Sequence, residues 1–269
     1  MTYGGLCATA MGNTTGTDPI ALTTEWIAAA IAGAIVAGDR RRAFTGVSID
    51  TRTLKPGDLF IAIRGDRFDG ADFAPAAIEA GAAGVVVPRG RSSPYAGRDV
   101  NAAGTAVIEV DDTTAALQAL GHAVRVESGA KVVAITGSAG KTTTKEITAE
   151  FLAARYRVIR NRGNFNNHIG LPLSLIELRE RPEIAVVELG MNHAGEISTL
   201  VRIADPDVRV WTNVGEAHLG FFASIDAIAD AKAEILERAT AASVLVANAD
   251  DDRTFGKFCA WHRESRFDR

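Results

Sequence analysis

From Lys131 onward, short apolar runs alternate with longer stretches in which apolar residues recur at helical spacing. The runs that we expect to be buried strands are Val132–Ile135, Ile184–Leu189, Val208–Val214 and Val244–Ala247. Strands that alternate with helices in this way form mostly parallel sheets with helices on both faces. The pattern therefore predicts an α/β domain over residues 131–269.

The preceding part of the chain shows the same alternation with shorter elements. Its expected strands are Val47–Ile49, Leu59–Ile63, Val85–Val87 and Val107–Val110. Ala74–Ala80, followed by Gly81, indicates a helix with a glycine stop, and Thr113–Val126 indicates a longer helix. We therefore expect a small α/β domain over residues 19–112, and a helix and linker over residues 113–130 that join it to the next domain.

The two ends of the chain carry weaker patterns. Residues 1–18 are rich in Gly and Thr, and we expect them to form a loose tail. Trp26–Gly38 is an apolar window of 13 residues, too short to span a bilayer, and we expect a buried or half-buried helix there. Residues 260–269 are polar and show no regular pattern.

Composition narrows the class of protein. A chain of 269 residues with 47% hydrophobic residues can bury two modest cores. The net charge of −4 gives no reason to expect nucleic acid as a partner. Cys7 and Cys259 form neither a disulfide framework nor a metal-binding spacing, which favours a reducing compartment. No Lys or Arg precedes Arg40, so the basic segment of a signal peptide is missing, and we expect a cytoplasmic protein without membrane insertion.

A glycine loop follows the first apolar run of the second half. Thr136–Lys145 reads T-G-S-A-G-K-T-T-T-K and leads into a helical pattern through Ile147 and Phe151. A strand, a glycine loop and a helix in this order bind nucleotide phosphates, because backbone N–H groups and the helix N-terminus face the oxygens. Lys141 would reach the β- and γ-phosphates of a nucleotide, and the Thr142 hydroxyl would ligate Mg²⁺. The residues expected to hold the nucleotide are Gly137, Ser138, Ala139, Gly140, Lys141, Thr142 and Thr143.

The loop is a shortened form of the general phosphate-binding pattern, which has a glycine where Ile135 stands. An ordinary strand-to-helix turn is the alternative, and the other strand ends help to decide. In open α/β sheets, ligands bind beyond the carboxyl ends of the strands. The next strands deliver Glu188, then Asn213 with His218 nearby, and finally Asn248 with Asp250. Their convergence favours a nucleotide site in one crevice.

Several longer motifs resemble the Mur ligases, the ATP-dependent amide ligases that build the peptide stem of bacterial peptidoglycan. The phosphate loop is similar to theirs, including the missing first glycine. The segments Asn164–Pro172 and Glu188–Ile197 are similar to the members that add D-Ala-D-Ala. Asn213–Leu219 and Ala231–Ile235 match in the same order, and Gly46–Arg52 and Lys55–Phe60 resemble the uridine-nucleotide domain of the family. The resemblance as a whole runs from about Ile20 to Asp252.

The resemblance implies an amide ligase that works through an acyl phosphate. The γ-phosphoryl group of ATP would pass to a carboxylate of UDP-MurNAc-tripeptide, and the amine of D-Ala-D-Ala would displace it. Lys141 and two Mg²⁺ ions would neutralise the converging anions. Glu188, His218 and Thr142 would ligate Mg²⁺, together with Lys232 after its reaction with CO₂ to a carbamate, which replaces a positive charge with a negative one.

The same resemblance assigns substrate contacts, and each residue has a plainer alternative. The expected substrate contacts are Ser48, Asp50, Arg52, Asn164, Asn166 and Asn167. Taken alone, Arg52 could form a surface ion pair, the asparagines could build a turn, and Lys232 could be exposed on an amphipathic helix. Glu188 could be an exposed strand end and His218 a polar surface residue. His168 stands where many relatives have an acidic residue, which leaves its role open.

Mur ligases have three domains, whereas this chain stops at Arg269. We therefore expect a truncated ATP-binding domain, no third domain, a monomer, and little or no ligation by this chain alone. Two alternatives remain open. One is a family member that adds the third amino acid of the stem, and the other is a non-catalytic fragment that binds a UDP-sugar and ATP.

Overall fold

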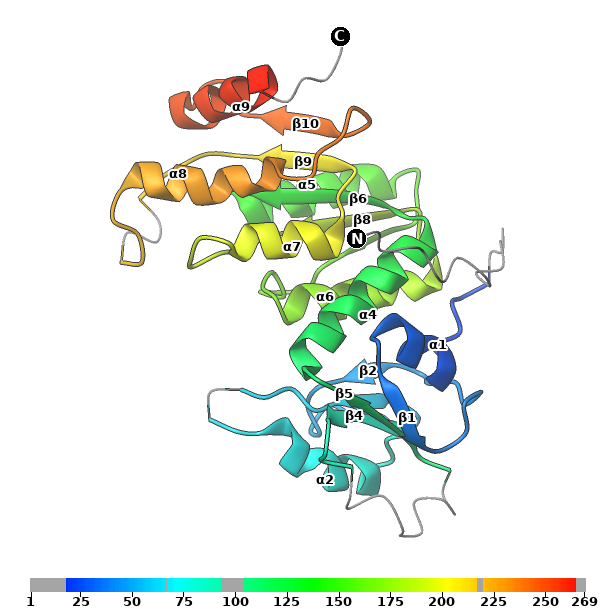
Figure 1. Cartoon of the computed structure of the whole chain (residues 1–269). Coiled ribbons are helices and arrows are strands. Elements are labelled where there is room, and N and C mark those ends of the chain that lie inside the picture. The colour runs from blue at the N-terminus through cyan, green and yellow to red at the C-terminus, as the bar shows by residue number, and fades with distance from the viewer. Residues whose placement is uncertain (1–17, 66, 93–103, 217–219, 265–269) are drawn as a thin grey trace, which may run out of the picture.

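Two five-stranded sheets form the framework of the computed structural model, which describes residues 18–65, 67–92, 104–216 and 220–264 (Figure 1). The loose tail predicted over residues 1–18 lies outside these ranges except for Asp18, and the predicted Mg²⁺ ligand His218 lies outside them as well. Within the described ranges, no helix has the length and apolar character needed to cross a membrane.

The first sheet has the strand order β1-β5-β4-β3-β2. Its strands are β1 (Ala34–Ala37), β2 (Val47–Ser48), β3 (Leu59–Ile61), β4 (Gly84–Pro88) and β5 (Ala106–Val110). β1 pairs antiparallel with β5, and the other neighbours are parallel. The helices of this part are α1 (Thr24–Ala30), η1 (Gly70–Phe73) and α2 (Ala74–Glu79). The four strands and the helix predicted after residue 46 are confirmed.

The prediction of one helix over Trp26–Gly38 is wrong in its second half. α1 ends at Ala30, Ala32 has a φ of 51°, and the chain then enters β1. A Cβ atom on Gly33 would lie 2.5 Å from Ile108 Cγ2, so glycine allows the chain to approach β5 closely. Successive residues of β1 alternate between exposed and half-buried, as in a strand at the edge of a sheet, and its β-branched residues Ile35 and Val36 favour a strand over a helix.

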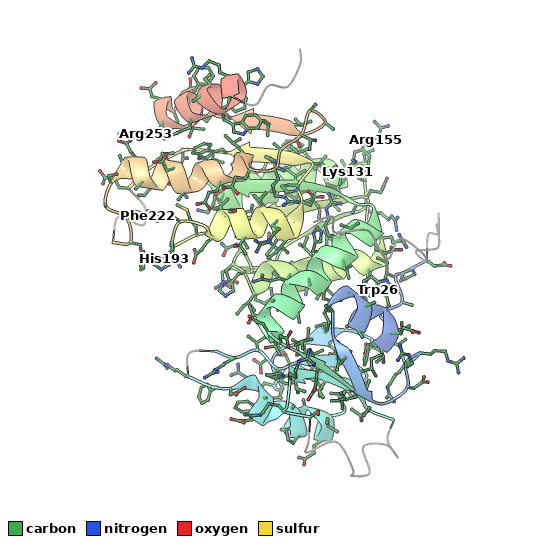
Figure 2. The ribbon with its side chains drawn as sticks, in the orientation of Figure 1. Trp26, Lys131, Arg155, His193, Phe222 and Arg253 are labelled. Carbon is green, nitrogen blue, oxygen red and sulfur yellow. The ribbon has the colours of Figure 1, made fainter. Side chains whose placement is uncertain are left out.

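The second sheet has the order β10-β9-β6-β8-β7, and all its neighbours are parallel. Its strands are β6 (Lys131–Thr136), β7 (Val158–Arg160), β8 (Ile184–Glu188), β9 (Val208–Trp211) and β10 (Val244–Ala247). The predicted α/β class with a mostly parallel sheet is therefore confirmed. Only β7 was not predicted, because three residues give too short a pattern. The carboxyl ends lie on the left of Figure 2, where His193 and Phe222 are labelled, and Lys131 at the start of β6 lies on the right.

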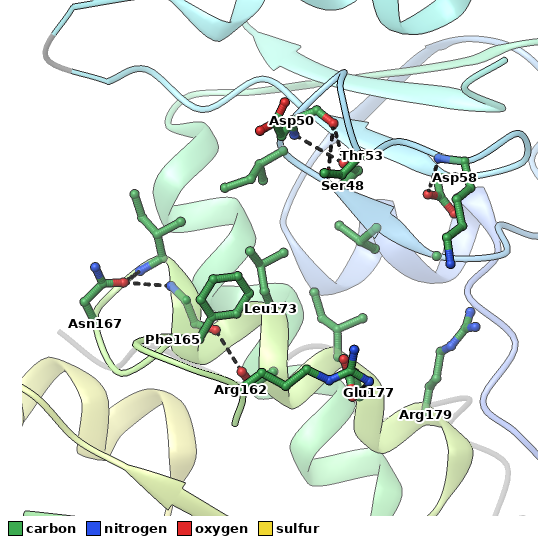
Figure 3. A pocket seen from close by; sticks show the side chains of 18 of the residues that line it. Ser48, Asp50, Thr53, Asp58, Arg162, Phe165, Asn167, Leu173, Glu177 and Arg179 are labelled. Carbon is green, nitrogen blue, oxygen red and sulfur yellow. Dashed lines mark hydrogen bonds and ion pairs between the residues drawn. The ribbon is translucent and has the colours of Figure 1, made fainter. Parts of the chain in front are cut away.

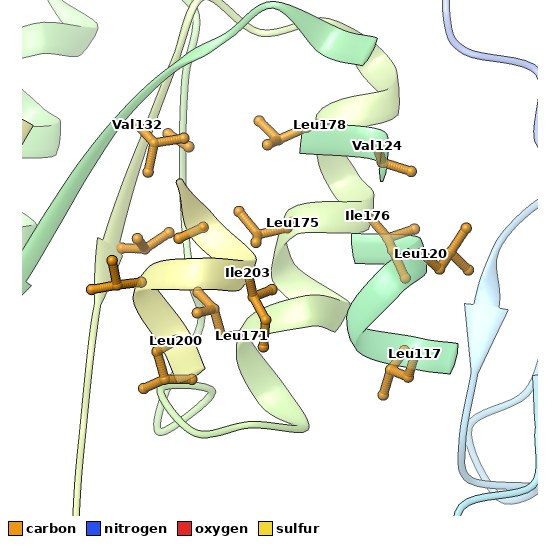
Figure 4. Close-up of a cluster of buried hydrophobic side chains, with 14 of the residues drawn as sticks. Leu117, Leu120, Val124, Val132, Leu171, Leu175, Ile176, Leu178, Leu200 and Ile203 are labelled. Carbon is orange, nitrogen blue, oxygen red and sulfur yellow. The ribbon is translucent and has the colours of Figure 1, made fainter. Parts of the chain in front are cut away.

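Helices cover both faces of this sheet. They are α4 (Thr113–Ser128), α5 (Lys141–Ala153), α6 (Gly170–Ile176) with η3 (Glu177–Glu180), α7 (Glu196–Ala204), α8 (Ile225–Ala233) with η4 (Glu234–Leu236), and α9 (Asp252–Glu264). Val133 and Ile135 pack with Ala149 of α5 on one face. Val132 and Ala134 belong to the core on the other face, which Figure 4 shows between α4, α6 and α7.

α4 contacts β4 of the first sheet and the helices α6 and α7 beside the second sheet, and its ends follow from its sequence. Asp112 accepts hydrogen bonds from the amides of Thr114 and Ala115 at 2.7 and 3.0 Å, and Gly129 ends the helix with a φ of 68°. Gly121 allows close packing on α6, since a Cβ atom there would lie 2.8 Å from Pro172 Cα. The predicted helix over Thr113–Val126 is confirmed.

The expectation of no regular structure after residue 260 is wrong as far as Glu264, where α9 ends. Asp251 starts this helix by accepting a hydrogen bond from the Thr254 amide at 2.8 Å, and it also accepts one from the Val214 amide at 3.0 Å. Phe258 and Trp261 pack against the main core. Phe255, Phe258 and Trp261 recur at helical spacing, but this pattern begins before residue 260, so a window that starts there does not contain it.

Candidate active site

The glycine loop after β6 is held against the end of β9. The Ser138 amide donates to Asn213 O at 3.0 Å, and the Ala139 amide donates to Asn213 Oδ1 at 2.9 Å. Gly137 has a φ of 152°, and a Cβ atom there would lie 1.9 Å from Thr212 Oγ1. The loop can therefore take this shape only with glycine at position 137.

The loop leads directly into the N-terminus of α5. Gly140, in the left-handed region with a φ of 79°, precedes the first helical residue, Lys141, and no side chain caps this end. The first amide groups of a helix have no intrahelical acceptor, so they are available to an anion, and the helix dipole favours one. Predicted loop residues 137–143 thus form a cradle suited to phosphate oxygens.

Two lysine side chains meet at this loop. Lys141 Nζ donates to Gly137 O at 2.8 Å, and Lys232 Nζ of α8 donates to the same carbonyl at 3.0 Å. Lys232 is only 1% exposed, which rules out the exposed position that its helical pattern alone suggested. Burial and then repulsion from Lys141 lower the pKa of Lys232 to about 8. Burial also lowers the pKa of Lys141, and the charge of Glu188 partly offsets that effect.

Glu188 at the end of β8 is the carboxylate of the site. It is 4% exposed, so it is not the exposed strand end of the plainer alternative. Its Oε2 accepts a hydrogen bond from Thr142 Oγ1 at 2.8 Å, and its Oε1 accepts one from Asn166 Nδ2 at 3.0 Å. A buried carboxylate is stable only with such partners.

The residues present fit a nucleotide with Mg²⁺. The Thr142 hydroxyl and the Glu188 carboxylate lie within hydrogen-bonding distance, and both are the hard oxygen ligands that Mg²⁺ prefers. The described part of the chain holds no group of three or more His, Cys, Asp and Glu side chains suited to a metal. A site with one carboxylate, one hydroxyl and substrate phosphates is typical of Mg²⁺, which uses few protein ligands.

Three cavities adjoin one another from this point to the first sheet. The first, of about 370 Å³, is lined by Lys141, Glu188, Asn166 and His168 among others. The second, of about 770 Å³, shares Asn164 and Asn167 with the first. Figure 3 shows this second cavity, with Ser48, Asp50, Thr53 and Asp58 on one side and residues around α6 on the other.

The third cavity, of about 740 Å³, shares Ile49 and Asp50 with the second and lies on the first sheet. Arg52 lines it, as do Phe60, Phe68 and Phe73. The three cavities together connect the phosphate loop with the segment around Asp50. The predicted substrate residues Ser48, Asp50, Arg52, Asn164, Asn166 and Asn167 all line at least one of them.

The segment after β2 turns instead of remaining extended. β2 ends at Ser48, and a turn follows in which the amides of Thr53 and Leu54 donate to Asp50 O. Arg52 NH2 lies 2.6 Å from Asp50 Oδ2 in an ion pair on the surface. The hydrogen bonds from Arg52 lower the pKa of Asp50 to about 2. Arg52 thus forms the surface ion pair of the plainer alternative, beside the cavity that Arg52 and Asp50 both line.

Sequence reasoning missed two buried side chains behind the site. Asn161 follows β7, and Lys145 lies one turn after Thr142 on α5; each is 1% exposed. A single asparagine after an undetected strand gives no signal, whereas Lys145 was part of the loop motif without a role. Asn192 and Glu196 also line the 370 Å³ cavity and were quoted only as part of a matching segment.

Comparison with known proteins matches both halves of the chain. Residues 43–125 match the Mur ligase family, catalytic domain, and residues 135–265 match the Mur ligase middle domain. The chain belongs to the Mur ligase family. The loop, Glu188 and Lys232 lie in the part that matches the middle domain of the family.

Among similar members, the UDP-N-acetylmuramoyl-tripeptide–D-alanyl-D-alanine ligase of Bacillus subtilis (strain 168) is 46% identical over 206 residues, which are 77% of this chain and 44% of that protein. A crystal structure of MurF from Acinetobacter baumannii has a TM-score of 0.81 at 33% identity and covers 91% of this chain and 52% of that chain.

The crystal structure of the MurF ligase from Thermotoga maritima in complex with ADP has a TM-score of 0.70 at 33% identity, over 80% of this chain and 48% of that chain. The chain thus spans about half the length of the relatives that it matches.

Proposed function

We propose that this protein acts in the ATP-dependent ligation of D-Ala-D-Ala to UDP-MurNAc-tripeptide through an acyl phosphate. The observation that carries the proposal is the series of adjoining cavities between the phosphate loop and the Asp50 segment. A substrate with a nucleotide at one end and a reacting carboxylate at the other needs such an extended path. The relatives named for this reaction support the same assignment.

ATP binds at the phosphate loop in this proposal. The amides at the start of α5 and the Lys141 ammonium hold the phosphates, and Thr142 and Glu188 hold Mg²⁺. His218 serves a second Mg²⁺. Bound Mg²⁺ lowers the repulsion between the substrate carboxylate and the γ-phosphoryl group that it attacks. A similar MurF forms a complex with ADP, which supports nucleotide binding by this chain.

Lys232 carries the carbamate in this proposal. Its nitrogen attacks the carbon of CO₂, a C–N bond forms, and the nitrogen loses a proton to water. Only the neutral amine can react, and a pKa of about 8 leaves a larger neutral fraction near neutral pH than an ordinary lysine has. The product carries a negative charge beside Lys141, which replaces a repulsion with an attraction.

The UDP-MurNAc-tripeptide spans the three cavities. Its uridine nucleotide lies in the 740 Å³ cavity beside Arg52 and its peptide in the 770 Å³ cavity. Its reacting carboxylate lies in the 370 Å³ cavity, where Asn166 and Lys141 provide donors. In domain terms, residues 19–112 bind the sugar nucleotide, residues 131–269 bind ATP, and residues 113–130 connect the two. We place the reaction in the bacterial cytoplasm, where ATP is available, and expect a monomer.

Calorimetric titration of the chain with UDP-MurNAc-tripeptide, with UDP-MurNAc-dipeptide as comparator, tests the proposal. We expect tighter binding of the tripeptide, because its third residue reaches the cavity that holds Asn166. Preference for the dipeptide would assign the protein to the members that add the third amino acid. Binding of neither ligand to the folded chain would contradict the proposed substrate. ATP consumption that depends on D-Ala-D-Ala separates a ligase from a module that only binds both ligands.

A further inference from the structure

The buried side chain of Asn161 joins the ends of two strands behind the site. β7 ends at Arg160, and beyond this residue the side chain of Asn161, in place of a backbone group, forms the hydrogen bonds to the end of β8. Asn161 Oδ1 accepts a hydrogen bond from the Glu188 amide at 3.0 Å, and Asn161 Nδ2 donates to Glu188 O at 3.4 Å. Both backbone groups of the residue that bears the site's carboxylate are therefore bound to one side chain.

The same amide also fixes the loop that faces Glu188. Asn161 Nδ2 donates to Phe165 O at 2.9 Å, and Phe165 directly precedes Asn166. Asn166 in turn donates to the Glu188 carboxylate at 3.0 Å. Asn161, Glu188, Asn166 and Phe165 thus form a closed ring, made of these hydrogen bonds and of the peptide bond between Phe165 and Asn166. Asn161 is bonded both to the backbone of Glu188 and to the loop that carries Asn166.

α5 is joined to this ring through Lys145. Its Nζ donates to Asn161 O at 2.9 Å and pairs with Glu146 Oε1 at 3.1 Å, although its side chain is 1% exposed. Lys145 lies one turn after Thr142, whose hydroxyl contacts the Glu188 carboxylate. Three segments that meet at Glu188 are therefore all bound to Asn161.

We propose that Asn161 is a positioning residue, which sets the Glu188 carboxylate in the place where it shares a Mg²⁺ ion with Thr142. This inference rests on the proposed function, in which Glu188 is a Mg²⁺ ligand. Asn161 is not among the residues that line the three cavities, and its hydrogen bonds described above go to Glu188, Phe165 and Lys145. Outer partners of a metal ligand commonly set metal affinity in this way.

The first test uses the ¹⁵N-labelled chain without ligands. In Asn161→Leu, we expect the Glu188 backbone amide to exchange faster with solvent and the Asn166 side-chain amide signal to shift. Ile159→Ala is the matched control, because Ile159 is partly buried on the same strand but contacts the core instead of the ring. Unchanged Glu188 and Asn166 signals in Asn161→Leu, or equal changes in Ile159→Ala, would overturn the proposal.

The second test measures ATP binding with MgCl₂ and with EDTA. We expect Asn161→Leu to lose about 10-fold of the affinity gained from Mg²⁺, with the affinity in EDTA unchanged. Asn161→Thr should recover part of the loss, because one hydroxyl can accept from the Glu188 amide and donate to Phe165 O. An unchanged Mg²⁺ effect in a folded Asn161→Leu chain would overturn the positioning role.

The two tests separate this inference from the proposed function. If the wild-type chain binds no ATP, the proposed function fails and the metal-positioning role fails with it, whatever the amide signals show. If the wild type binds ATP with a clear Mg²⁺ effect and Asn161→Leu keeps that effect, only the role of Asn161 is wrong.

Discussion

At the scale of single residues, the site consists of charged side chains that are largely buried and that share a small number of hydrogen-bond partners. Lys141 and Lys232 share the Gly137 carbonyl, and Glu188 is shared by Thr142 and Asn166. The sequence predicted a role for Lys141, Lys232 and Glu188 because they lie in long motifs, and the structure places their side chains at one loop. It could not identify Asn161, because a hydrogen-bonding role between strand ends has no pattern along the chain.

Replacing Lys141 should weaken ATP binding while leaving the fold intact. Hydrogen bonds to charged groups contribute about 1.5–3 kcal/mol, so Lys141→Met should raise the Kd for MgATP by about 10- to 150-fold. Lys131→Met is the control, because Lys131 is 71% exposed and distant from the loop. Calorimetry gives the Kd, and thermal unfolding checks the fold. A Kd within twofold of wild type would contradict the role of Lys141.

The carbamate on Lys232 should be visible directly. With ¹³C-bicarbonate, the wild-type chain should show a carbamate carbon signal by NMR that is lost in Lys232→Ala. The carbamate signal should persist in Lys145→Met, because Lys145 is as buried as Lys232 but its ammonium group is bound to Asn161 O and Glu146. A folded wild-type chain without the signal, or a signal that persists in Lys232→Ala, would exclude the carbamate from this position.

At the scale of elements, the apolar runs predicted β6 and β8 well because these central strands are buried along almost their whole length, and they also predicted β10, although Val244 and Val246 are exposed there. Errors came where local preference and packing disagree. Ala and Ile dominate the window around β1 and predict a helix, whereas the close approach of Gly33 to Ile108 is a tertiary contact that the local sequence does not show. α9 was missed because its apolar spacing begins before residue 260.

The approach of α4 to α6 gives a prediction at this scale. Gly121→Ala places a methyl group 2.8 Å from Pro172 Cα, so the helices must move apart, and overpacking of this kind costs about 1–3 kcal/mol. Gly256→Ala on α9 is the matched control, because nothing lies within 4 Å of its added Cβ. Urea unfolding should show a loss for Gly121→Ala and a gain of up to about 1 kcal/mol for Gly256→Ala. Equal stability of the two variants would contradict the packing argument.

At the scale of the whole molecule, α4 contacts β4 of the first sheet and is bound by the buried Arg125 to the segment between α7 and β9. Arg125 donates to Ala204 O at 2.9 Å, to Asp205 O at 2.7 Å and to Asp207 Oδ2 at 2.8 Å. The helix itself was predicted from its apolar spacing. The ion pair between Arg125 and Asp207 could not be predicted from the sequence, because the two residues are 82 positions apart and no local pattern connects them.

This ion pair should make stability depend on pH. Burial alone would raise the pKa of Asp207, but hydrogen bonds from Lys131 and the Val132 amide, with the charge of Arg125, hold this pKa below its usual range. A carboxyl group whose pKa is lower in the folded than in the unfolded protein stabilises the fold at pH values above its unfolded-state pKa. This contribution is lost as the pH falls through the folded-state pKa. Asp207→Asn should therefore cost about 1–3 kcal/mol at pH 7 in urea unfolding, with a smaller difference in acid.

Asp111→Asn provides the control for this pH dependence. Asp111 pairs with Arg89 at 2.8 Å, but its side chain is 84% exposed, so the change should leave the free energy of unfolding nearly constant. A cost for Asp207→Asn that is equally large at pH 7 and below pH 3 would show that lost packing, not charge, is responsible.

The central claim is that the three adjoining cavities form one substrate path that ends at the Lys141–Glu188 site. A crystal structure of this chain with ADP, Mg²⁺ and UDP-MurNAc-tripeptide tests it most directly. We predict the ADP phosphates on the amides at the start of α5, the uridine beside Arg52, and the peptide carboxylate beside Asn166. A sugar nucleotide bound outside these cavities, or ADP away from the glycine loop, would contradict the account.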